Sequence, residues 1–214
     1  MNATIIGGTG LVGSHLLRLL LDDERFTSVA ALGRRPIGVA HAKLRDAVVD
    51  FRAPESFAAL VAGDVLFSAL GTTIGAAGSQ AAQREVDHGI QLRVAQAARR
   101  NGVPALVLVS SAGASPRARI FYSRMKGELE RDVEALGFER LRILRPGPLD
   151  GERREPRRGE RWALRVLRPL APVLPAAARP VHAAVVARAA IRVALDPAPG
   201  CARVEAREIF RLGA

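Results

Sequence analysis

A glycine-rich segment near the N-terminus constrains this chain more than any other part of its sequence. Residues 7–13 read Gly-Gly-Thr-Gly-Leu-Val-Gly, after the apolar run Thr4-Ile5-Ile6 and before a leucine-rich stretch. That order predicts a strand, a tight turn and a buried helix. Glycines at positions 7, 10 and 13 let the backbone approach a pyrophosphate closely, with the phosphate charge at the helix N-terminus. We therefore expect a dinucleotide to contact Gly7, Thr9, Gly10, Leu11, Val12 and Gly13.

Short aliphatic runs alternate with helical segments along most of the chain. Continuous apolar strands between helices are typical of a parallel sheet that helices cover on both faces. We therefore predict an α/β fold, a doubly wound parallel sheet of the Rossmann type with a small C-terminal substrate or lid region. The expected strands are residues 4–6, 29–32, 47–49, 65–67, 105–109 and 141–144, and the expected helices are 11–20, 80–100, 119–136 and 183–195.

The length of 214 residues predicts a single domain over residues 1–214, which we expect to bind a dinucleotide through its glycine-rich segment. Within it we expect a cofactor-binding core at 1–147 and a substrate or lid region at 148–214. The segment 148–180 is rich in proline and arginine, and only Trp162–Leu170 has a helical apolar face. The arginine-rich part, 151–165, is either a solvated loop or a lid that attracts an acidic substrate.

The composition names no partner by itself. The formal net charge is +11, but the 32 basic residues include only two lysines, and such an arginine excess is typical of a GC-biased genome. We expect no nucleic-acid partner, because the cations are scattered and aromatic residues, at 4%, are sparse. The single cysteine, Cys201, permits no internal disulfide, and the four histidines have no metal-ligand spacing. We predict no metal, no membrane span and, from an N-terminus without export features, a cytoplasmic protein.

The residues after the second expected strand indicate which dinucleotide binds. A carboxylate there usually accepts hydrogen bonds from a free ribose 2′-hydroxyl, but this chain has Gly33-Arg34-Arg35. A guanidinium offers paired donors to a 2′-phosphate, and no carboxylate repels it. The sequence therefore favours NADP(H), held by Arg34 and Arg35; the alternative is that both belong to the general arginine excess.

A second pattern indicates catalysis. Tyr122, the only tyrosine, and Lys126 lie four residues apart and thus on one helix face, with Ser110-Ser111 at the end of the preceding strand. An ammonium group stabilises a neighbouring phenolate and can bond a ribose hydroxyl, while a serine can hold a substrate carbonyl. We therefore predict Ser111, Tyr122 and Lys126 as catalytic residues, with Ser110, Tyr122 and Lys126 also touching the cofactor.

Together these motifs, with Arg145-Pro146-Gly147, resemble the short-chain dehydrogenase/reductase superfamily over residues 1–150, and its atypical Tat-interacting-protein-like NAD(P)H-binding oxidoreductase branch. The resemblance implies that Asp50 and Phe51 lie by the adenine. It places Ser68, Ala69, Leu70 and Gly71 over the adenosine ribose, and Pro146 and Gly147 at the nicotinamide. The family's usual asparagine on the fourth helix is Asp87 here, so a water-mediated proton relay through that position is not carried over.

Three functions follow from these expectations. The first is an NADP(H)-dependent oxidoreductase that reduces a carbonyl or oxidises an alcohol of a small, unidentified substrate. The alternatives are an NADPH-binding redox sensor without turnover and a nucleotide-sugar epimerase or dehydratase that retains its cofactor. We expect a monomer or a homodimer. Substrate specificity would lie in loops 72–80 and 148–180, which match no chemistry readable from sequence.

Overall fold

The computed structural model describes residues 1–150 and 176–214. The expectations for the arginine-rich segment 151–165 and for the amphipathic stretch Trp162–Leu170 lie outside the described residues. In the part of the chain that is described, no helix combines the length and the apolar character needed to cross a membrane.

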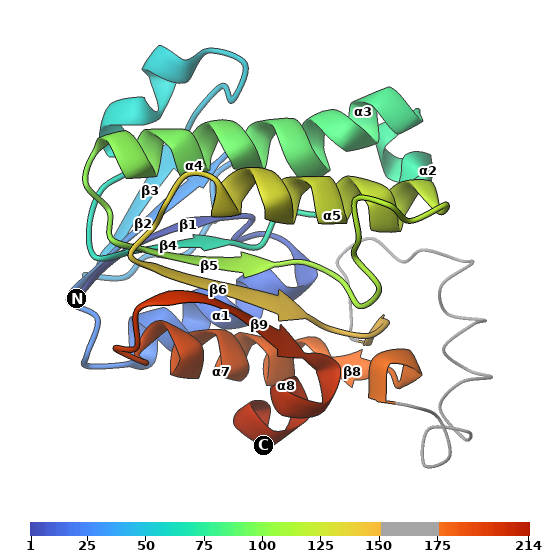
Figure 1. Cartoon of the computed structure of the whole chain (residues 1–214). Coiled ribbons are helices and arrows are strands. Elements are labelled where there is room, and N and C mark those ends of the chain that lie inside the picture. The colour runs from blue at the N-terminus through green and yellow to red at the C-terminus, as the bar shows by residue number, and fades with distance from the viewer. Residues whose placement is uncertain (151–175) are drawn as a thin grey trace.

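Parallel strands build the central sheet, in the order β3-β2-β1-β4-β5-β6-β9 (Figure 1). Their bounds are β1 Asn2–Ile6, β2 Ser28–Gly33, β3 Leu44–Val48, β4 Val65–Ser68, β5 Ala105–Val109, β6 Arg140–Arg145 and β9 Gly200–Glu205. In register, Ile5 of β1 lies opposite Ala31 of β2 and Phe67 of β4. A second, two-stranded sheet pairs β7, Leu149–Asp150, with β8, Val181–His182.

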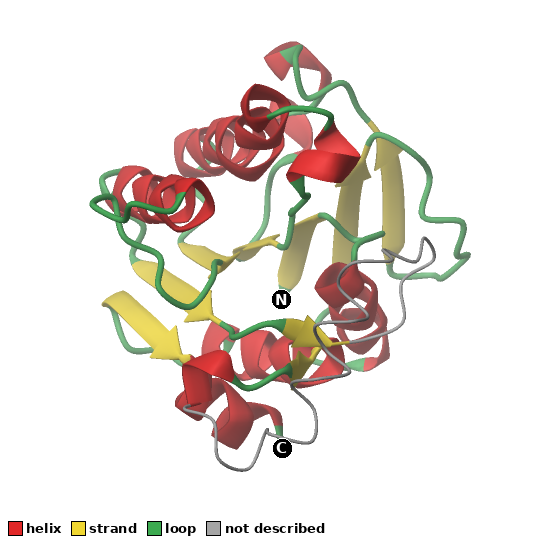
Figure 2. Cartoon of the chain, turned by 90° about the vertical axis from the view of Figure 1, so that its right-hand side faces the viewer, coloured by secondary structure: helices red, strands yellow, loops and turns green. Residues whose placement is uncertain are grey.

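Helices cover both faces of the central sheet, as Figures 1 and 2 show. One face carries α1 (Leu11–Asp22), α7 (Ala183–Ala194) and α8 (Ala206–Gly213); the other carries α3 (Gln80–Arg84), a π-helical segment (Glu85–Ile90), α4 (Gln91–Arg100) and α5 (Phe121–Glu134). Shorter pieces are α2 (Ile74–Ala77) and 3-10 turns at Pro54–Ser56, Ala58–Leu60 and Ala176–Ala178.

The two faces bury separate apolar clusters. Successive side chains of a strand point to opposite faces, so Ile5 packs with Leu16 of α1 and Val186 of α7, whereas Ile6 packs with Val94 of α4 and Leu129 of α5. This two-sided burial explains the continuous apolar strands of the sequence. The predicted doubly wound parallel α/β fold is confirmed.

The sequence analysis did not predict β9, and it placed β3 too late in the chain. Both are edge strands, and most of their side chains face solvent: only Val204 of β9 is buried. An edge strand with one solvated side needs no continuous apolar run. Residues 183–213, which the sequence analysis assigned to the substrate or lid region, thus contribute two helices and a strand to the central layers.

Because the strands are parallel, their carboxyl ends meet at one edge of the sheet, which faces the viewer in Figure 2. The glycine-rich turn follows β1 there, and the loops after β2, β4, β5 and β6 gather beside it. In open α/β sheets ligands bind outside this edge, so the fold brings all the predicted site segments to one side.

Candidate functional site

The glycine-rich turn is packed too tightly for any side chain at two of its positions. Gly7 has φ +84°, and a Cβ atom there would lie 2.6 Å from the carbonyl carbon of Ala69. A Cβ atom on Gly13 would lie 2.0 Å from the Gly7 carbonyl oxygen. Helix α1 begins at Leu11, and its N-cap residue, Gly10, has no side chain to bond the first N–H groups. Those groups point outward from the helix N-terminus, where phosphate oxygens can accept their hydrogen bonds.

A cleft of about 510 Å³ opens between this turn and the ends of β2 and β4. None of its described lining residues is acidic, and Arg34 and Arg35 supply the cationic groups. Neither guanidinium forms an ion pair with another described residue. The lining residues are Gly7, Gly8, Thr9, Leu32, Gly33, Arg34, Arg35, Ile37, Phe51, Leu70, Val86 and Ile90.

Of the two residues predicted beside the adenine, only Phe51 reaches the cleft. Its ring is 3% exposed and packs against Phe57, with the ring centroids 5.7 Å apart. Asp50 instead turns to solvent, where its Oδ2 atom lies 3.1 Å from Nη2 of Arg52. Hydrogen bonds from Arg52 lower the pKa of the Asp50 carboxyl. The structure therefore brings Phe51, but not Asp50, to the cleft.

The segment after β4 forms the opposite wall. Leu70 lines the cleft, and Ala69 is the residue against which Gly7 packs. The buried Ser68 donates a hydrogen bond of 2.7 Å to Oε1 of Gln91, so its hydroxyl is engaged inside the protein. The amide of Gln91 in turn donates to the Leu70 carbonyl at 3.3 Å. Gln91, which the sequence analysis did not single out, thus holds both Ser68 and Leu70 by hydrogen bonds on the protein side of the wall.

The predicted catalytic pair lies on α5. The Tyr122 side chain is 37% exposed, whereas Lys126, one turn later, is 2% exposed. The Lys126 ammonium lies 3.1 Å from Oδ1 of the fully buried Asp87. Burial alone would lower the pKa of Lys126, but interactions with Tyr122, Asp87 and Glu130 outweigh it and raise that pKa. The ammonium therefore stays charged beneath the phenol.

The two serines after β5 differ in what they can do. Ser110 is buried and donates a hydrogen bond of 2.5 Å to Glu130, so the protein uses its hydroxyl internally. Ser111 is partly exposed, and its hydroxyl makes a long bond of 3.3 Å to the carbonyl of the next residue, Ala112. Helix α5 lies close to this loop because Gly127 has no side chain: a Cβ atom there would lie 2.2 Å from the carbonyl carbon of Ser115.

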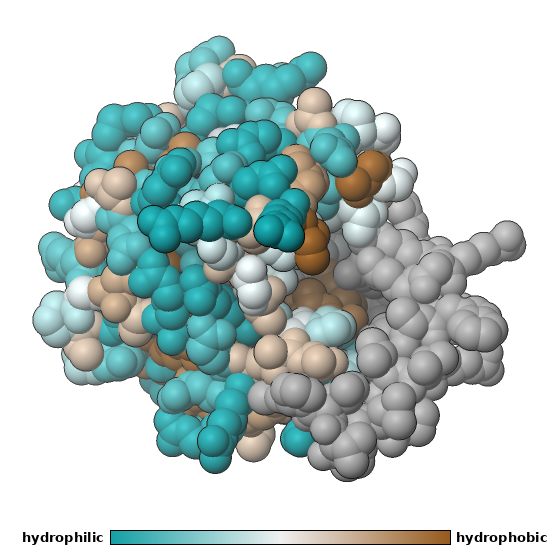
Figure 3. Space-filling view, turned by 45° about the vertical axis from the view of Figure 1, so that its right-hand side comes forward, coloured by the Kyte–Doolittle hydropathy of each residue, from teal (hydrophilic) through white to brown (hydrophobic). Residues whose placement is uncertain are grey.

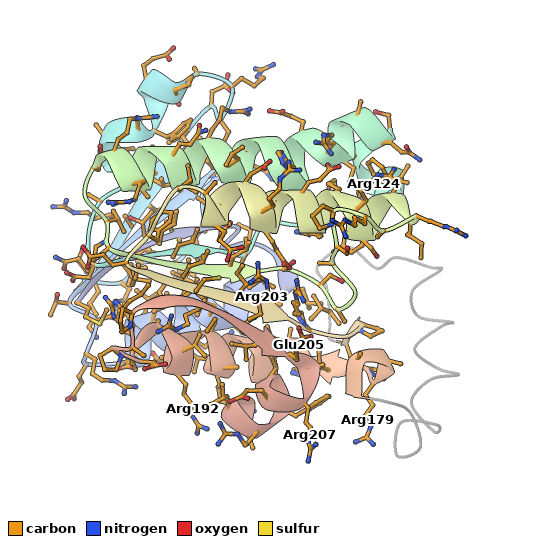
Figure 4. The ribbon with its side chains drawn as sticks, in the orientation of Figure 1. Arg124, Arg179, Arg192, Arg203, Glu205 and Arg207 are labelled. Atoms are coloured by element: carbon orange, nitrogen blue, oxygen red, sulfur yellow. The ribbon has the colours of Figure 1, made fainter. Side chains whose placement is uncertain are left out.

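Glu130 is the centre of a network that the sequence analysis missed. It is 2% exposed and lies 2.5 Å from Nη2 of Arg145 on β6, while Arg203 on β9 approaches it at 3.7 Å. Arg145 also pairs with Glu205 at 3.0 Å, and Figure 4 shows Arg203 and Glu205 reaching this region from β9. A signal existed, because Glu130 follows Lys126 by four residues and so shares its helix face.

The network holds the turn that was predicted to meet the nicotinamide. Arg145 directly precedes Pro146, whose carbonyl accepts a hydrogen bond of 2.8 Å from the Ala112 amide after β5. A Cβ atom on Gly147 would lie 2.6 Å from the carbonyl oxygen of Arg179. The missing side chain therefore lets the backbone at Arg179 approach this turn closely. Pro146 and Gly147 therefore lie in the same loop cluster as Ser111.

The surface near this edge is mixed in character. In Figure 3 hydrophobic side chains gather next to the grey residues, on a face that is otherwise largely hydrophilic. Three of the large apolar side chains that are exposed, Ile74, Ile120 and Tyr122, belong to α2 and to the start of α5. Among the described residues, no group of three or more His, Cys, Asp or Glu side chains could hold a metal ion.

Comparison with known proteins agrees with this geometry. Residues 7–197 match the family described as NAD(P)H-binding. The mitochondrial protein fmp52 of Aspergillus fumigatus is 37% identical over 222 residues, covering 99% of this chain and 94% of that protein. The mitochondrial protein FMP52 of Saccharomyces cerevisiae is 44% identical over 157 residues, covering 72% of this chain and 68% of that protein.

Solved structures show the same fold at low sequence identity. MoeE5 in complex with UDP-glucuronic acid and NAD has a TM-score of 0.73 and 20% identity, covering 96% of this chain and 76% of its own. The Thermus thermophilus UDP-glucose 4-epimerase, complexed with NAD, has a TM-score of 0.72 and 20% identity. The match covers 99% of this chain and 81% of the epimerase chain. A short chain dehydrogenase family protein from Francisella tularensis has a TM-score of 0.71 and 13% identity. The match covers 97% of this chain and 98% of that protein's chain.

These relatives correct one prediction and establish the family. The expected cytoplasmic location is wrong on their evidence, because the curated relatives are named mitochondrial proteins. The absence of export features in the sequence did not distinguish the two compartments. The family match covers most of the chain, and the fold and the glycine-rich turn agree with it. The chain therefore belongs to the NAD(P)H-binding family and has the fold of the atypical short-chain dehydrogenases/reductases.

Proposed function

We propose that this protein is an NADP(H)-dependent oxidoreductase that reduces a carbonyl group, or oxidises an alcohol, of a small molecule. The observation that carries the proposal is the buried Lys126 ammonium beneath the partly exposed Tyr122 phenol on α5. A charged lysine held inside the protein beside a solvent-facing phenol is an arrangement suited to proton transfer. From the names of its relatives, we place this reaction in mitochondria.

The residues at the glycine-rich turn fit a dinucleotide. Gly7 and Gly13 leave room only for backbone, and the free N–H groups at the start of α1 suit a pyrophosphate. The bound nicotinamide would supply or accept the hydride. Leu70 and Phe51 would lie against the adenosine half, and Pro146 with Gly147 would lie on the nicotinamide side.

The protein's own groups would handle the proton. In reduction, the Tyr122 hydroxyl donates its proton to the alkoxide that forms as the carbonyl carbon gains hydride. The Ser111 hydroxyl donates a hydrogen bond to the same oxygen, and the Lys126 ammonium stabilises the phenolate that remains. Alcohol oxidation reverses each step. Ser110 takes no part, because its hydroxyl is bonded to Glu130.

The preference for NADP(H) rests on the cationic rim of the cleft. Arg34 and Arg35 follow β2, where a carboxylate would otherwise bind the ribose 2′-hydroxyl. Both guanidinium groups are exposed, and they make no ion pair with other described residues, so they remain available to a 2′-phosphate. The epimerase alternative has support at the level of the fold alone, since the neighbours that bear that name are 20% identical or less.

The test removes a single oxygen atom. Tyr122→Phe keeps the ring and deletes the proton, so NADPH affinity by calorimetry should stay nearly unchanged while turnover of a reducible aldehyde or ketone falls by roughly 10²–10⁴. Ser123→Ala, which deletes a hydroxyl from the next residue of α5, should keep full turnover. If Tyr122→Phe retains full turnover, the mechanism is wrong. If the unmutated protein binds NADPH but reduces no compound of a broad carbonyl panel, the sensor alternative replaces it.

A further inference from the structure

The π-helical segment Glu85–Ile90 turns two consecutive side chains towards α5. Asp87 reaches Lys126 at 3.1 Å, and His88 reaches Oδ2 of Asp132 at 2.8 Å. In a regular α-helix neighbouring residues point about 100° apart, and here both side chains contact the same partner helix. Single π-helical turns often occur at functional sites.

The first of these contacts is isolated from water. The side chains of Lys126 and Asp87 are 2% and 0% exposed. A buried charge is costly unless an opposite charge and hydrogen bonds compensate it, so each group depends on the other. At 3.1 Å the two atoms touch directly, which leaves no room for a bridging water between them.

The same carboxylate also holds the loop after β4. Its second oxygen, Oδ2, accepts a hydrogen bond of 2.8 Å from the backbone amide of Thr72. The side chain of Gln83 donates to the Thr72 carbonyl at 3.1 Å, so both backbone polar groups of Thr72 are hydrogen-bonded. Thr72 lies two residues after Leu70, which lines a wall of the cleft. Asp87 therefore connects this wall to the Lys126 ammonium.

We propose that Asp87 is a positioning residue for Lys126, which it holds by a direct buried ion pair and ties to the backbone of the Thr72 loop. Where the resemblance to the short-chain dehydrogenases/reductases implies an asparagine, this chain has a carboxylate in contact with the lysine. The contact stands by itself, and its catalytic consequence rests on the proposed function. Losing it would leave the ammonium buried without its nearest counter-charge.

The chain offers a direct readout, because Lys43 and Lys126 are its only lysines. Protein labelled with carbon-13 lysine should give two side-chain signals whose pH titrations are followed separately by NMR. In Asp87→Asn the titration of Lys126 should move to lower pH, because the ammonium loses a contact that raises its pKa while its burial stays the same. Lys43, whose ammonium donates to the Asp23 carbonyl at 3.0 Å, should titrate as before and serves as the internal control.

Two further variants separate positioning from packing. Asp132→Asn removes the other carboxylate that joins α5 to the π-helical segment and should leave the Lys126 titration unchanged. Asp87→Glu restores the charge and should return the titration towards its original position. If Asp87→Asn does not fold, the double variant Asp87→Asn/Lys126→Gln should fold, because it leaves no unpaired charge.

An unchanged Lys126 titration in folded Asp87→Asn would overturn the proposal, as would failure of the double variant to restore a fold that the single variant lost. Neither result depends on turnover. A protein without reductase activity would still show the titration shift if Asp87 holds Lys126. Failure of the proposed function and failure of this proposal are therefore distinguishable.

Discussion

The glycine-rich turn and the charged groups around α5 both serve the same edge of the sheet, but they are built in opposite ways. The turn works by leaving side chains out: Gly7 and Gly13 lie where a Cβ atom would overlap backbone. The groups around α5 work by bringing side chains together. The buried Lys126 pairs with the buried Asp87 of the π-helical segment, and the buried Glu130 pairs with Arg145 of β6. The first region consists of seven consecutive residues, whereas the second is assembled from segments that lie far apart in the chain.

The largest effect should come from the inner part of the charged network. Glu130→Gln removes the buried carboxylate that pairs with Arg145 and accepts the hydrogen bond from Ser110. Breaking a buried ion pair costs about 3–5 kcal/mol. Glu128→Gln is the matched control on the same helix, because its ion pair with Arg84 is partly exposed and worth less than about 1 kcal/mol. Urea unfolding of both variants measures the difference. Equal losses would mean that burial does not distinguish the two glutamates.

A smaller effect is expected from adding one methyl group to the turn. Gly13→Ala places a Cβ atom 2.0 Å from a backbone oxygen that cannot move away, so we expect the upper end of the usual overpacking cost of about 1–3 kcal/mol. Gly8→Ala is the control, since its Cβ atom meets only the ends of two side chains, Ile37 at 3.2 Å and Leu17 at 3.7 Å. Thermal unfolding should rank Gly8→Ala above Gly13→Ala. The reverse order would show that the turn is not limited by space.

Arg34 and Arg35, which line the cleft beside the glycine-rich turn, should determine the relative affinity for NADPH and NADH. We expect NADPH to bind at least tenfold more tightly than NADH, because a charge-assisted hydrogen bond contributes about 1.5–3 kcal/mol. Arg34→Ala should remove most of that preference. Arg45→Ala, which deletes the same charge from the exposed face of β3, should keep it. Calorimetry that finds equal affinities for the two cofactors in the unmutated protein would contradict this prediction.

The smallest effect belongs to the outer part of the network. Burial would raise the pKa of Asp132, but hydrogen bonds from Arg131 and His88 outweigh it and lower that pKa. A lowered pKa in the folded state means that the stabilisation is present above the ordinary carboxyl value and is lost as the pH falls through the folded value. The pair is partly exposed, so Asp132→Asn should cost less than about 1 kcal/mol near neutral pH and nothing in acid. Urea unfolding at both pH values checks this, and a cost that persists in acid would exclude an ionic origin.

The same contrast explains what the sequence could predict. The buried strands, the glycine-rich turn and the Tyr122–Lys126 spacing are local patterns, and the structure confirms the sheet that they predict. Asp87 could be noticed only as a departure from a familiar motif, because its partner lies 39 positions away on another helix. Which polar residues meet inside a protein depends on the packing of elements that local periodicity does not encode.

Sequence patterns also failed where a segment is exposed or irregular. Asp50 follows a strand in the expected place, yet its carboxylate pairs with Arg52 in solvent, because nothing in the local sequence fixes which way it turns. The expected helix 80–100 is interrupted by a π-helical turn that the apolar periodicity of these residues does not predict. The edge strand β9 lacks an apolar run, since only Val204 is buried.

The position of β9 in the chain has a consequence for synthesis. β6 ends at Arg145, but its neighbour in the sheet begins only at Gly200, after α7 has been made. While a ribosome translates the messenger, the β6 edge and the face later covered by α7 therefore stay open. Pairings between residues so far apart form slowly and expose unpaired edges meanwhile. The nascent chain can form the strands beside the glycine-rich turn early, but the β6 edge is covered only once β9 has been made.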